Sequence, residues 1–202
     1  MGKLIVTEFL TLDGVAQAPG GREEDQEQGF EHGGWQAPLM DAAAGAAIFD
    51  NARGMDALLL GRRTYDIFAG YWPQAPDGPF TELLNRVPKY VASRTLSEPL
   101  EWRNSSLLDG EVADAVAQLK QRHEAIHVIG SLDLTQTLLR HRLIDRLELW
   151  FHPLALGSGK RVFATGTVPT AFRLLDATPY ASGSVLLAYA LAGTPTYGTI
   201  GA

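Results

Sequence analysis

The amino-acid sequence predicts an α/β fold: a mixed, mostly parallel sheet with helices on both faces and an antiparallel hairpin at its C-terminal end. Short apolar segments typical of buried strands alternate with segments that have helical spacing. The last two strand-like segments follow each other with only a turn between them, which indicates a hairpin. The chain of 202 residues suits one domain with a proper core. We expect residues 1–192 to form this domain and residues 193–202 to be a loose tail.

The N-terminal half is expected to contain two strands and two helices around a long loop. The first strand is β-branched and apolar, and it ends at the turn signal Asp13-Gly14. The loop is rich in Gly, Glu, Asp and Gln. This composition is typical of a mobile segment, which either covers a site or has no function of its own. The expected elements are a strand over Lys3–Leu12, the loop over Ala18–Gly34, an alanine-rich helix over Pro38–Ala52, a strand over Ala57–Leu60 and a helix after Gly61.

The C-terminal half continues the alternation and ends in the hairpin. A proline-rich loop, Pro73–Pro79, precedes it. Amphipathic spacing predicts the helices, short apolar runs predict the strands, and Pro179 with Gly183 predicts the hairpin turn. The expected elements are a strand over Lys89–Ser93, a helix over Gly110–Arg122, a strand over Ile126–Ile129, a helix over Leu134–His141, a strand over Arg146–His152, and two strands around Phe172–Thr178 and Ser184–Leu191.

Composition excludes several classes of function. The net charge is −6 and the isoelectric point is near 5.3, which disfavours general attraction to nucleic acid or to an anionic membrane. The chain has no cysteine, so disulfides, thiol nucleophiles and thiolate metal sites are excluded. No apolar stretch is long enough to cross a bilayer, and Met1-Gly2-Lys3 does not begin a signal peptide. We therefore expect a cytoplasmic protein.

Three turns that follow predicted parallel strands have the chemistry of phosphate binding. They are Gly61-Arg62-Arg63-Thr64, Ser93-Arg94-Thr95 and Gly130-Ser131. Helix N-termini offer free N–H groups, glycine permits close approach, and guanidinium forms paired hydrogen bonds. Ligands of open α/β sheets lie beyond the carboxyl ends of the strands, so the three turns are expected to converge. Convergence would favour a dinucleotide with an extra phosphate, NADP; the alternative is three surface turns with incidental arginines.

Taken in order, several segments resemble the dihydrofolate reductase-like superfamily. The similarity is to the branch shared with the reductase domain of the bifunctional riboflavin-biosynthesis deaminase–reductase, and it spans about Lys3 to Leu191. A three-layer fold is implied. The segments that carry the resemblance are Thr11-Leu12-Asp13-Gly14, Leu58 to Tyr65, Lys89 to Thr95, Val128-Ile129-Gly130-Ser131 with Leu138-Leu139, and Pro153 to Phe163.

The resemblance implies NADPH bound across the strand ends, and a homodimer. One departure is Leu132, which stands where relatives usually have a second glycine at the diphosphate turn. The implied contacts are Gly61, Arg62 and Thr64 to cofactor phosphates, Ser93 and Arg94 to the adenosine side with its 2′-phosphate, Gly130, Ser131 and Leu132 to the diphosphate, and Leu12, Asp13 and Gly14 near the nicotinamide.

Candidate residues for substrate chemistry follow from the same resemblance. Dihydrofolate reductases place a carboxylate on the helix after the first loop, and Asp41 occupies that region. Trp35, Met40 and Tyr65 are the candidate substrate contacts. Asp13 or Asp41, or a water held by them, is the candidate proton source. The alternative is that Asp41 is a solvated residue in the first turn of the helix, where the dipole favours acids.

The sequence therefore predicts an NADPH-dependent reductase. Hydride would be transferred to a C=N or C=O of a small pterin-, pyrimidine- or flavin-precursor-like heterocycle, with the loop over Ala18–Gly34 excluding water. The alternative is a dimeric nucleotide-binding or regulatory protein of the same fold without turnover, and Leu132 is the feature that favours it.

Two further motifs are expected to carry no function. His123-Glu124-Ala125-Ile126-His127 fits the zinc-protease pattern, but His127 begins a strand, so both histidines would not share one helical face. Gly157-Ser158-Gly159-Lys160 resembles a phosphate loop, but it lies between strands and lacks the following Ser or Thr. No metal site is predicted.

Overall fold

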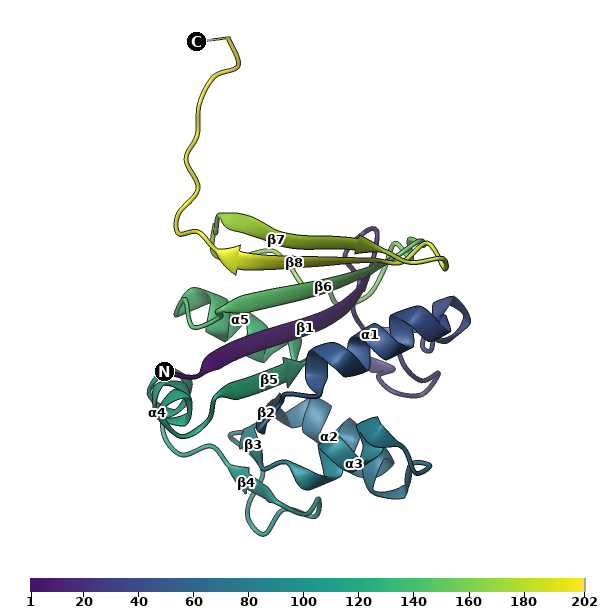
Figure 1. Ribbon diagram of the computed structural model, residues 1–202, viewed down its shortest axis with the longest axis vertical. Helices are drawn as coiled ribbons and strands as arrows, with labels where there is room; N and C mark the ends of the chain where they lie inside the picture. The colour runs from purple at the N-terminus through teal and green to yellow at the C-terminus, as the bar shows by residue number, and fades with distance from the viewer. Residues whose placement is uncertain (202) are drawn as a thin grey trace.

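The computed structural model describes residues 1–201, which form an eight-stranded sheet with helices on both faces (Figure 1). The spatial order is β4-β3-β2-β5-β1-β6-β8-β7. All pairs from β4 to β6 are parallel, and β8 pairs antiparallel with β6 and with β7, so the predicted fold class is confirmed. The strands are β1 (Lys3–Thr11), β2 (Ala57–Gly61), β3 (Lys89–Ala92), β4 (Ser105–Leu107), β5 (Ala125–Ile129), β6 (Arg146–His152), β7 (Phe172–Pro179) and β8 (Val185–Leu191).

Five α-helices cover the sheet, three on one face and two on the other (Figure 1). Leucines of α4 and α5 pack with the apolar side chains of β1 and β5 in one core cluster. Residues of α1, α2 and α3 pack on the opposite face, against β2 and β3. The helices are α1 (Ala42–Ala52), α2 (Arg62–Tyr71), α3 (Pro79–Arg86), α4 (Val112–Arg122) and α5 (Leu132–Arg140).

The start of α1 differs from the prediction. The helix begins at Ala42, not at Pro38, because Asp41 caps it: its carboxylate accepts a hydrogen bond from the backbone N–H of Ala44 at 2.7 Å. The preceding segment Ala37–Leu39 forms only a short 3₁₀ turn. The proline therefore starts a separate turn before the helix.

Two elements were absent from the prediction, α3 and β4. Pro79 occupies the first turn of α3, where a backbone N–H would have no partner within the helix and its absence in proline costs nothing. The prediction placed this proline in a loop, whereas it starts a helix. Asn85 of α3 is buried and accepts a hydrogen bond from the Trp102 indole N–H at 2.7 Å. Strand β4 has three residues and no fully buried one, so it leaves little pattern in the sequence.

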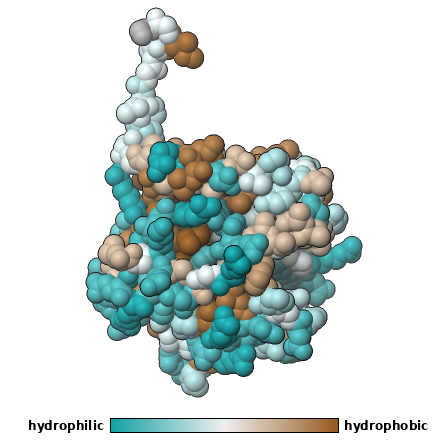
Figure 2. Space-filling view, in the orientation of Figure 1, coloured by the Kyte–Doolittle hydropathy of each residue, from teal (hydrophilic) through white to brown (hydrophobic). Residues whose placement is uncertain are grey.

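The β7 edge of the sheet is apolar and exposed. Figure 2 shows hydrophobic surface gathered over this edge, where Leu174 and Leu175 are 51% and 41% exposed. Residues 193–201 form no helix or strand and extend away from the sheet (Figure 1); residue 202 of the predicted tail lies outside the described residues. The homodimer stays a prediction. Within residues 1–201 no helix is long and apolar enough to span a membrane.

Candidate functional site

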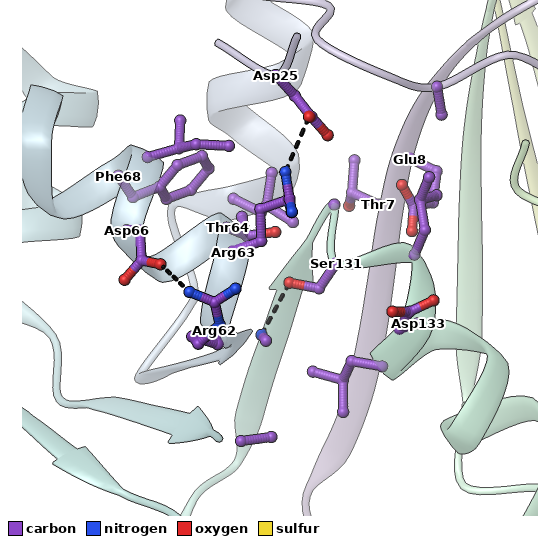
Figure 3. A pocket seen from close by; sticks show the side chains of 18 of the residues that line it. Thr7, Glu8, Asp25, Arg62, Arg63, Thr64, Asp66, Phe68, Ser131 and Asp133 are labelled. Atoms are coloured by element: carbon purple, nitrogen blue, oxygen red, sulfur yellow. Dashed lines mark hydrogen bonds and ion pairs between the residues drawn. The ribbon is translucent and has the colours of Figure 1, made fainter. Parts of the chain in front are cut away.

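A cleft of about 2140 Å³ opens at the carboxyl ends of the parallel strands. Its lining comes from β1, β2, β3, β5 and β6, the length of α2, the first turns of α4 and α5, the C-terminal half of α1, and the long loop after β1. This is the edge at which open α/β sheets bind ligands. Figure 3 shows Arg62, Arg63 and Thr64 on one side of the cleft, with Ser131 and Glu8 opposite them.

All three predicted phosphate turns line this cleft. They are residues 61–64, 93–95 and 130–132. Two of them are joined directly, because the backbone N–H of Gly61 donates to Ser131 Oγ at 2.9 Å. The N-cap residues of α2 and α5 form no side-chain hydrogen bond to the helix. The first backbone N–H groups of both helices therefore have no side-chain acceptor at these cap positions. Two adjacent, uncapped helix N-termini form a site suited to an anion.

The backbone explains why Leu132 need not be glycine. Gly130 and Ser131 both have a φ of +69°, the left-handed region that disfavours most side chains. Leu132 already belongs to the first turn of α5 and needs no positive φ. Its side chain packs against the core on the α4–α5 face. The positions of the turn that need a positive φ are thus residues 130 and 131. Leu132, the residue that departs from the family pattern, comes directly after them.

The arginines of the cleft differ in whether a carboxylate already pairs with them. Arg62 pairs with Asp66 at 3.0 Å, one turn along α2 (Figure 3). Arg63 pairs with two carboxylates of the long loop, as described below. Arg94 is exposed and takes part in no ion pair among residues 1–201. Arg94 is therefore the cleft arginine most available to a ligand.

The long loop is held over the cleft by four charged side chains, here called the loop clamp: Asp25, Glu27, Arg63 and Lys160. Asp25 lies 3.0 Å from Arg63 Nη1 and 2.6 Å from Lys160 Nζ. Glu27 pairs with the same two cations, both at 2.5 Å. Burial raises the pKa of Asp25, but the hydrogen bonds from Lys160 and from the Glu27 backbone N–H, together with the charges of Lys160 and Arg63, outweigh it, and the net shift is downward. The clamp joins the loop to α2 and to the segment after β6, and it gives Arg63 a role that the sequence left unassigned.

The end of the cleft between α1 and the sheet is here called the inner pocket. Strand register places Thr7 beside Glu148 and Phe9 beside Trp150, so all four share one sheet face. Glu148 is buried and accepts hydrogen bonds from Thr7 Oγ1 at 3.2 Å and from Arg146 Nε at 2.7 Å. The inner pocket is lined by Thr7, Phe9, Gln36, Ile48, Asn51, Ala52, Glu148 and Trp150.

Glu8 is a buried carboxyl group that lines the cleft together with the three predicted phosphate turns. It lies just beyond the last β1–β5 pair, Thr7 with Ile129, where the two strands separate. The hydroxyl of Thr135 in α5 donates to its carboxylate at 2.9 Å. Burial raises the pKa of Glu8 from 4.5 to about 8, against the lowering effect of this hydrogen bond. Glu8 is therefore mainly protonated at neutral pH.

The two predicted catalytic acids lie outside the cleft lining. Asp13 accepts hydrogen bonds from Thr11, from the backbone N–H groups of Leu156 and Gly157, and from Arg161. The Thr11 hydroxyl and these donors hold its pKa well below the usual range, despite some desolvation. Both oxygens of Asp41 accept backbone N–H groups, one in α1 and one in the β7–β8 turn. The structure therefore gives both acids structural contacts and places neither beside the cleft.

The other predicted substrate and nicotinamide residues also lie outside the lining. Trp35 is buried in the loop and donates to the carbonyl of Gln17 at 2.8 Å. Tyr65 is buried against the α2–α3 core, where its hydroxyl accepts the backbone N–H of Trp102 at 3.1 Å. The remaining three, Met40, Leu12 and Gly14, are partly or largely solvent-exposed and contribute nothing to the cleft lining.

The two discounted motifs have structural explanations. His123 caps the end of α4 and its ring contacts the Tyr90 hydroxyl at 2.9 Å, whereas His127 lies within β5. Burial lowers the pKa of His127 to about 4, so it is neutral. Lys160 of the glycine-rich segment belongs to the loop clamp. Residues 1–201 contain no cluster of three or more His, Asp or Glu that could hold a metal ion.

Sequence reasoning missed the residues of the inner pocket and Glu8. A signal was present: a glutamate interrupts each of two apolar strand segments, Ile5-Val6-Thr7-Glu8-Phe9-Leu10 and Leu147-Glu148-Leu149-Trp150. Charged side chains are rare in buried strands unless they are paired or functional. Alternation alone could not show that the two glutamates point to opposite faces of the sheet.

Known proteins are similar to this chain over nearly its full length. "Uncharacterized protein YyaP" of Bacillus subtilis strain 168 is 27% identical over 193 residues, covering 93% of this chain and 94% of the relative. A solved structure from Shewanella sp. PV-4, named as a candidate riboflavin biosynthesis protein, has a TM-score of 0.66 at 20% identity and covers 94% of this chain and 98% of that one. These likenesses extend over whole chains.

A longer solved protein shares the fold as well. The diaminohydroxyphosphoribosylaminopyrimidine deaminase/5-amino-6-(5-phosphoribosylamino)uracil reductase of Thermotoga maritima has a TM-score of 0.62 at 14% identity, and the match covers 95% of this chain but only 57% of that protein. At such identities the likeness shows the fold, and it confirms the expected dihydrofolate reductase-like, three-layer arrangement. The model of the family described as the RibD C-terminal domain matches residues 2–186, and this chain belongs to that family.

Proposed function

We propose that this protein is an NADPH-dependent reductase that transfers hydride to a C=N or C=O of a small heterocycle. The observation that carries the proposal is the pair of uncapped helix N-termini, α2 and α5, joined by the Gly61–Ser131 hydrogen bond in one cleft with Arg94. Helix N-termini favour the diphosphate, and an unpaired arginine favours a phosphomonoester. The family supports reductase chemistry, and one fold relative, from Corynebacterium diphtheriae, is named a pyrimidine reductase-like protein.

Each part of the cleft then has a task. Thr64, Arg62 and the first N–H groups of α2 would hold phosphate oxygens, and Gly61, whose own N–H donates to Ser131 Oγ, would permit their close approach. Gly130 and the first N–H groups of α5 hold the diphosphate, and Ser93 with Arg94 binds the 2′-phosphate. When bound, NADPH supplies the hydride. The fit rests on the open N-termini and on the exposure of Arg94.

Glu8 is the candidate proton source in place of Asp13, and because its side chain and that of Glu148 point to opposite faces of the sheet, it would act where β1 and β5 separate. Its carboxyl group holds a proton at neutral pH and lines the cleft where β1 and β5 separate. General acids work best when their pKa lies near the operating pH. The loop above the cleft, fastened by the loop clamp, excludes water from the reacting groups.

The cofactor assignment is tested by fluorescence titration of the wild type and of Arg94→Gln with NADPH and NADH. We expect Arg94→Gln to weaken NADPH binding by roughly ten- to thirtyfold and to leave NADH binding unchanged, because one charge-assisted contact to the extra phosphate is worth about 1.5–2 kcal/mol. Arg53→Gln, an exposed arginine paired with Asp50 outside the cleft, is the matched control and should change neither affinity.

Three outcomes are decisive. No binding of either cofactor to the wild type would contradict the proposed reductase. An equal loss for NADPH and NADH in Arg94→Gln would contradict the 2′-phosphate contact. Cofactor binding without NADPH oxidation across pterins, pyrimidines and flavin precursors would favour the dimeric regulatory protein without turnover.

A further inference from the structure

The inner pocket contains buried hydrogen-bond donors that no group of residues 1–201 accepts. They are Trp150 Nε1, Gln36 Nε2 and Asn51 Nδ2. Trp150 is 1% exposed and Gln36 is 7% exposed, and all three residues line the cleft. A buried polar group without a partner costs the full desolvation of that group, and native proteins have few of them. Three in the lining of one cleft indicate a ligand that presents acceptors to it.

The same pocket contains one strong acceptor. Glu148 is buried beside Trp150 on β6, two residues away and therefore on the same sheet face. Among residues 1–201, its Oε2 accepts a hydrogen bond only from the Thr7 hydroxyl, at 3.2 Å, while Oε1 accepts from Arg146. A carboxylate has about four lone-pair sites, so Glu148 can accept further N–H donors. An indole donor next to a carboxylate acceptor matches the edge of an amide, which has a carbonyl oxygen beside an N–H.

The walls of the pocket suit a flat apolar ring. Phe9, Ile48 and Ala52 line it from the sheet and from α1, and the Phe9 and Trp150 rings lie 6.4 Å apart between centroids. Ligand sites commonly combine such apolar walls with a few convergent polar groups. A planar heterocycle with an amide-like edge fits both features.

Among the residues that the structure describes, none provides the inner pocket with an unpaired cation that could bind a phosphate. Lys160 and Arg63, the cations nearest to the loop that covers it, each pair with both Asp25 and Glu27. Arg146 pairs with Glu148 and does not line the cleft. Because Arg146 is already used by Glu148, no cation among the described residues of the pocket remains to offset the desolvation of a phosphate there, so a phosphorylated ligand is disfavoured. This contrasts with the phosphoribosyl substrate in the name of the Thermotoga maritima relative.

We propose that the inner pocket binds an uncharged, unphosphorylated planar heterocycle whose amide-like edge accepts from Trp150 and donates to Glu148. The inference rests on the proposed reductase function for its role as the substrate subsite. It deepens that function by excluding sugar-phosphate substrates.

Calorimetric titration of the full chain, with and without saturating NADP⁺, tests the ligand class. The probes are two matched pairs, riboflavin against FMN and uridine against UMP, together with 7,8-dihydrobiopterin. We expect at least one unphosphorylated probe to bind, and its phosphorylated partner, where the pair has one, to bind at least tenfold more weakly. Binding of FMN or UMP as tightly as its partner would overturn the proposal, as would the absence of binding by every probe.

Matched tryptophan variants test the recognition itself. Trp150→Phe keeps an aromatic ring and removes an N–H that has no partner, whereas Trp102→Phe removes an N–H that donates to Asn85 outside the cleft. We expect Trp150→Phe and Glu148→Gln each to weaken binding of the best probe by at least tenfold. Trp102→Phe should lower the melting temperature more than Trp150→Phe and should leave probe binding unchanged.

The outcomes separate this inference from the proposed function. Unchanged probe binding in both Trp150→Phe and Glu148→Gln, with the variants folded, would overturn the inner-pocket assignment even if NADPH binds. Probe binding without NADPH binding would leave the pocket assignment standing and would contradict the reductase.

Discussion

The free energy of unfolding is expected to fall by about 5 kcal/mol between pH 4.5 and pH 8 through the titration of Glu8 alone. Burial raises the folded-state pKa of this carboxyl group from 4.5 to about 8, and each pKa unit corresponds to about 1.4 kcal/mol. Between these two values the unfolded chain has lost the proton and the folded chain has kept it. The folded state then binds more protons, so stability decreases as pH rises and becomes level above pH 8.

Urea unfolding at pH 5.5, 7 and 8.5 measures this effect in the wild type and in Glu8→Gln. The glutamine keeps an acceptor for the Thr135 hydroxyl but cannot ionise, so its stability should depend much less on pH. Glu31→Gln, at an exposed position of the loop, is the control and should follow the wild type. Identical pH dependence in Glu8→Gln and the wild type would show that Glu8 does not carry the effect.

The pH profile of turnover provides a second readout for Glu8. If Glu8 holds the transferred proton, the reductase rate should decline as pH rises through about 8. Glu8→Gln should then lower the rate and remove this limb of the profile. If the rate is unchanged in Glu8→Gln, Glu8 does not donate the proton and affects only the stability of the fold.

The convergence of three turns on one cleft could be predicted because its signals are local. Strand, glycine, cation and helix follow one another within a few residues at Gly61–Thr64, and a single topological rule places successive turns at one sheet edge. The convergence of residues 61–64, 93–95 and 130–132 needs no knowledge of side-chain packing. Leu132 looked anomalous only because the sequence does not show which residue of the turn needs a positive φ.

The inner pocket depends on long-range strand pairing, which the sequence does not reveal. Thr7 meets Glu148, and Phe9 meets Trp150, only through the β1–β6 register, across 141 residues of chain. Asp13 and Asp41 were plausible acids by position, but nearby N–H donors use their oxygens for structure. Local spacing cannot distinguish a free carboxylate from one that fastens a loop.

Replacing Asp25 should open the loop over the cleft. In Asp25→Ala, Arg63 and Lys160 each lose a carboxylate, and Asp25 itself is 8% exposed, so its pairs are less screened than surface pairs. Losing one member of a buried pair costs about 3–5 kcal/mol, and the partial exposure of both cations reduces this to about 2–3 kcal/mol. The closed loop should therefore be destabilised by roughly thirty- to hundredfold.

Limited proteolysis within residues 18–34 and NADPH oxidation at saturating substrate measure this opening. The Asp25→Ala variant should be cleaved faster and should turn over more slowly, because an open loop admits water and protease alike. Asp50→Asn is the matched control: it breaks an exposed pair, between Arg53 Nε and Asp50 at 3.6 Å, that lies outside both the clamp and the cleft lining.

High salt separates the clamp from simple packing of the loop. Lys160 and Arg63 remain partly exposed, so salt should weaken their pairs and speed cleavage of the wild type, whereas Asp25→Ala should respond less. If packing of Phe30 and Trp35 alone held the loop, Asp25→Ala would be cleaved at the wild-type rate at every salt concentration. That result would show that Asp25 is dispensable for loop closure and that packing of the hydrophobic cluster is sufficient to hold the loop over the cleft.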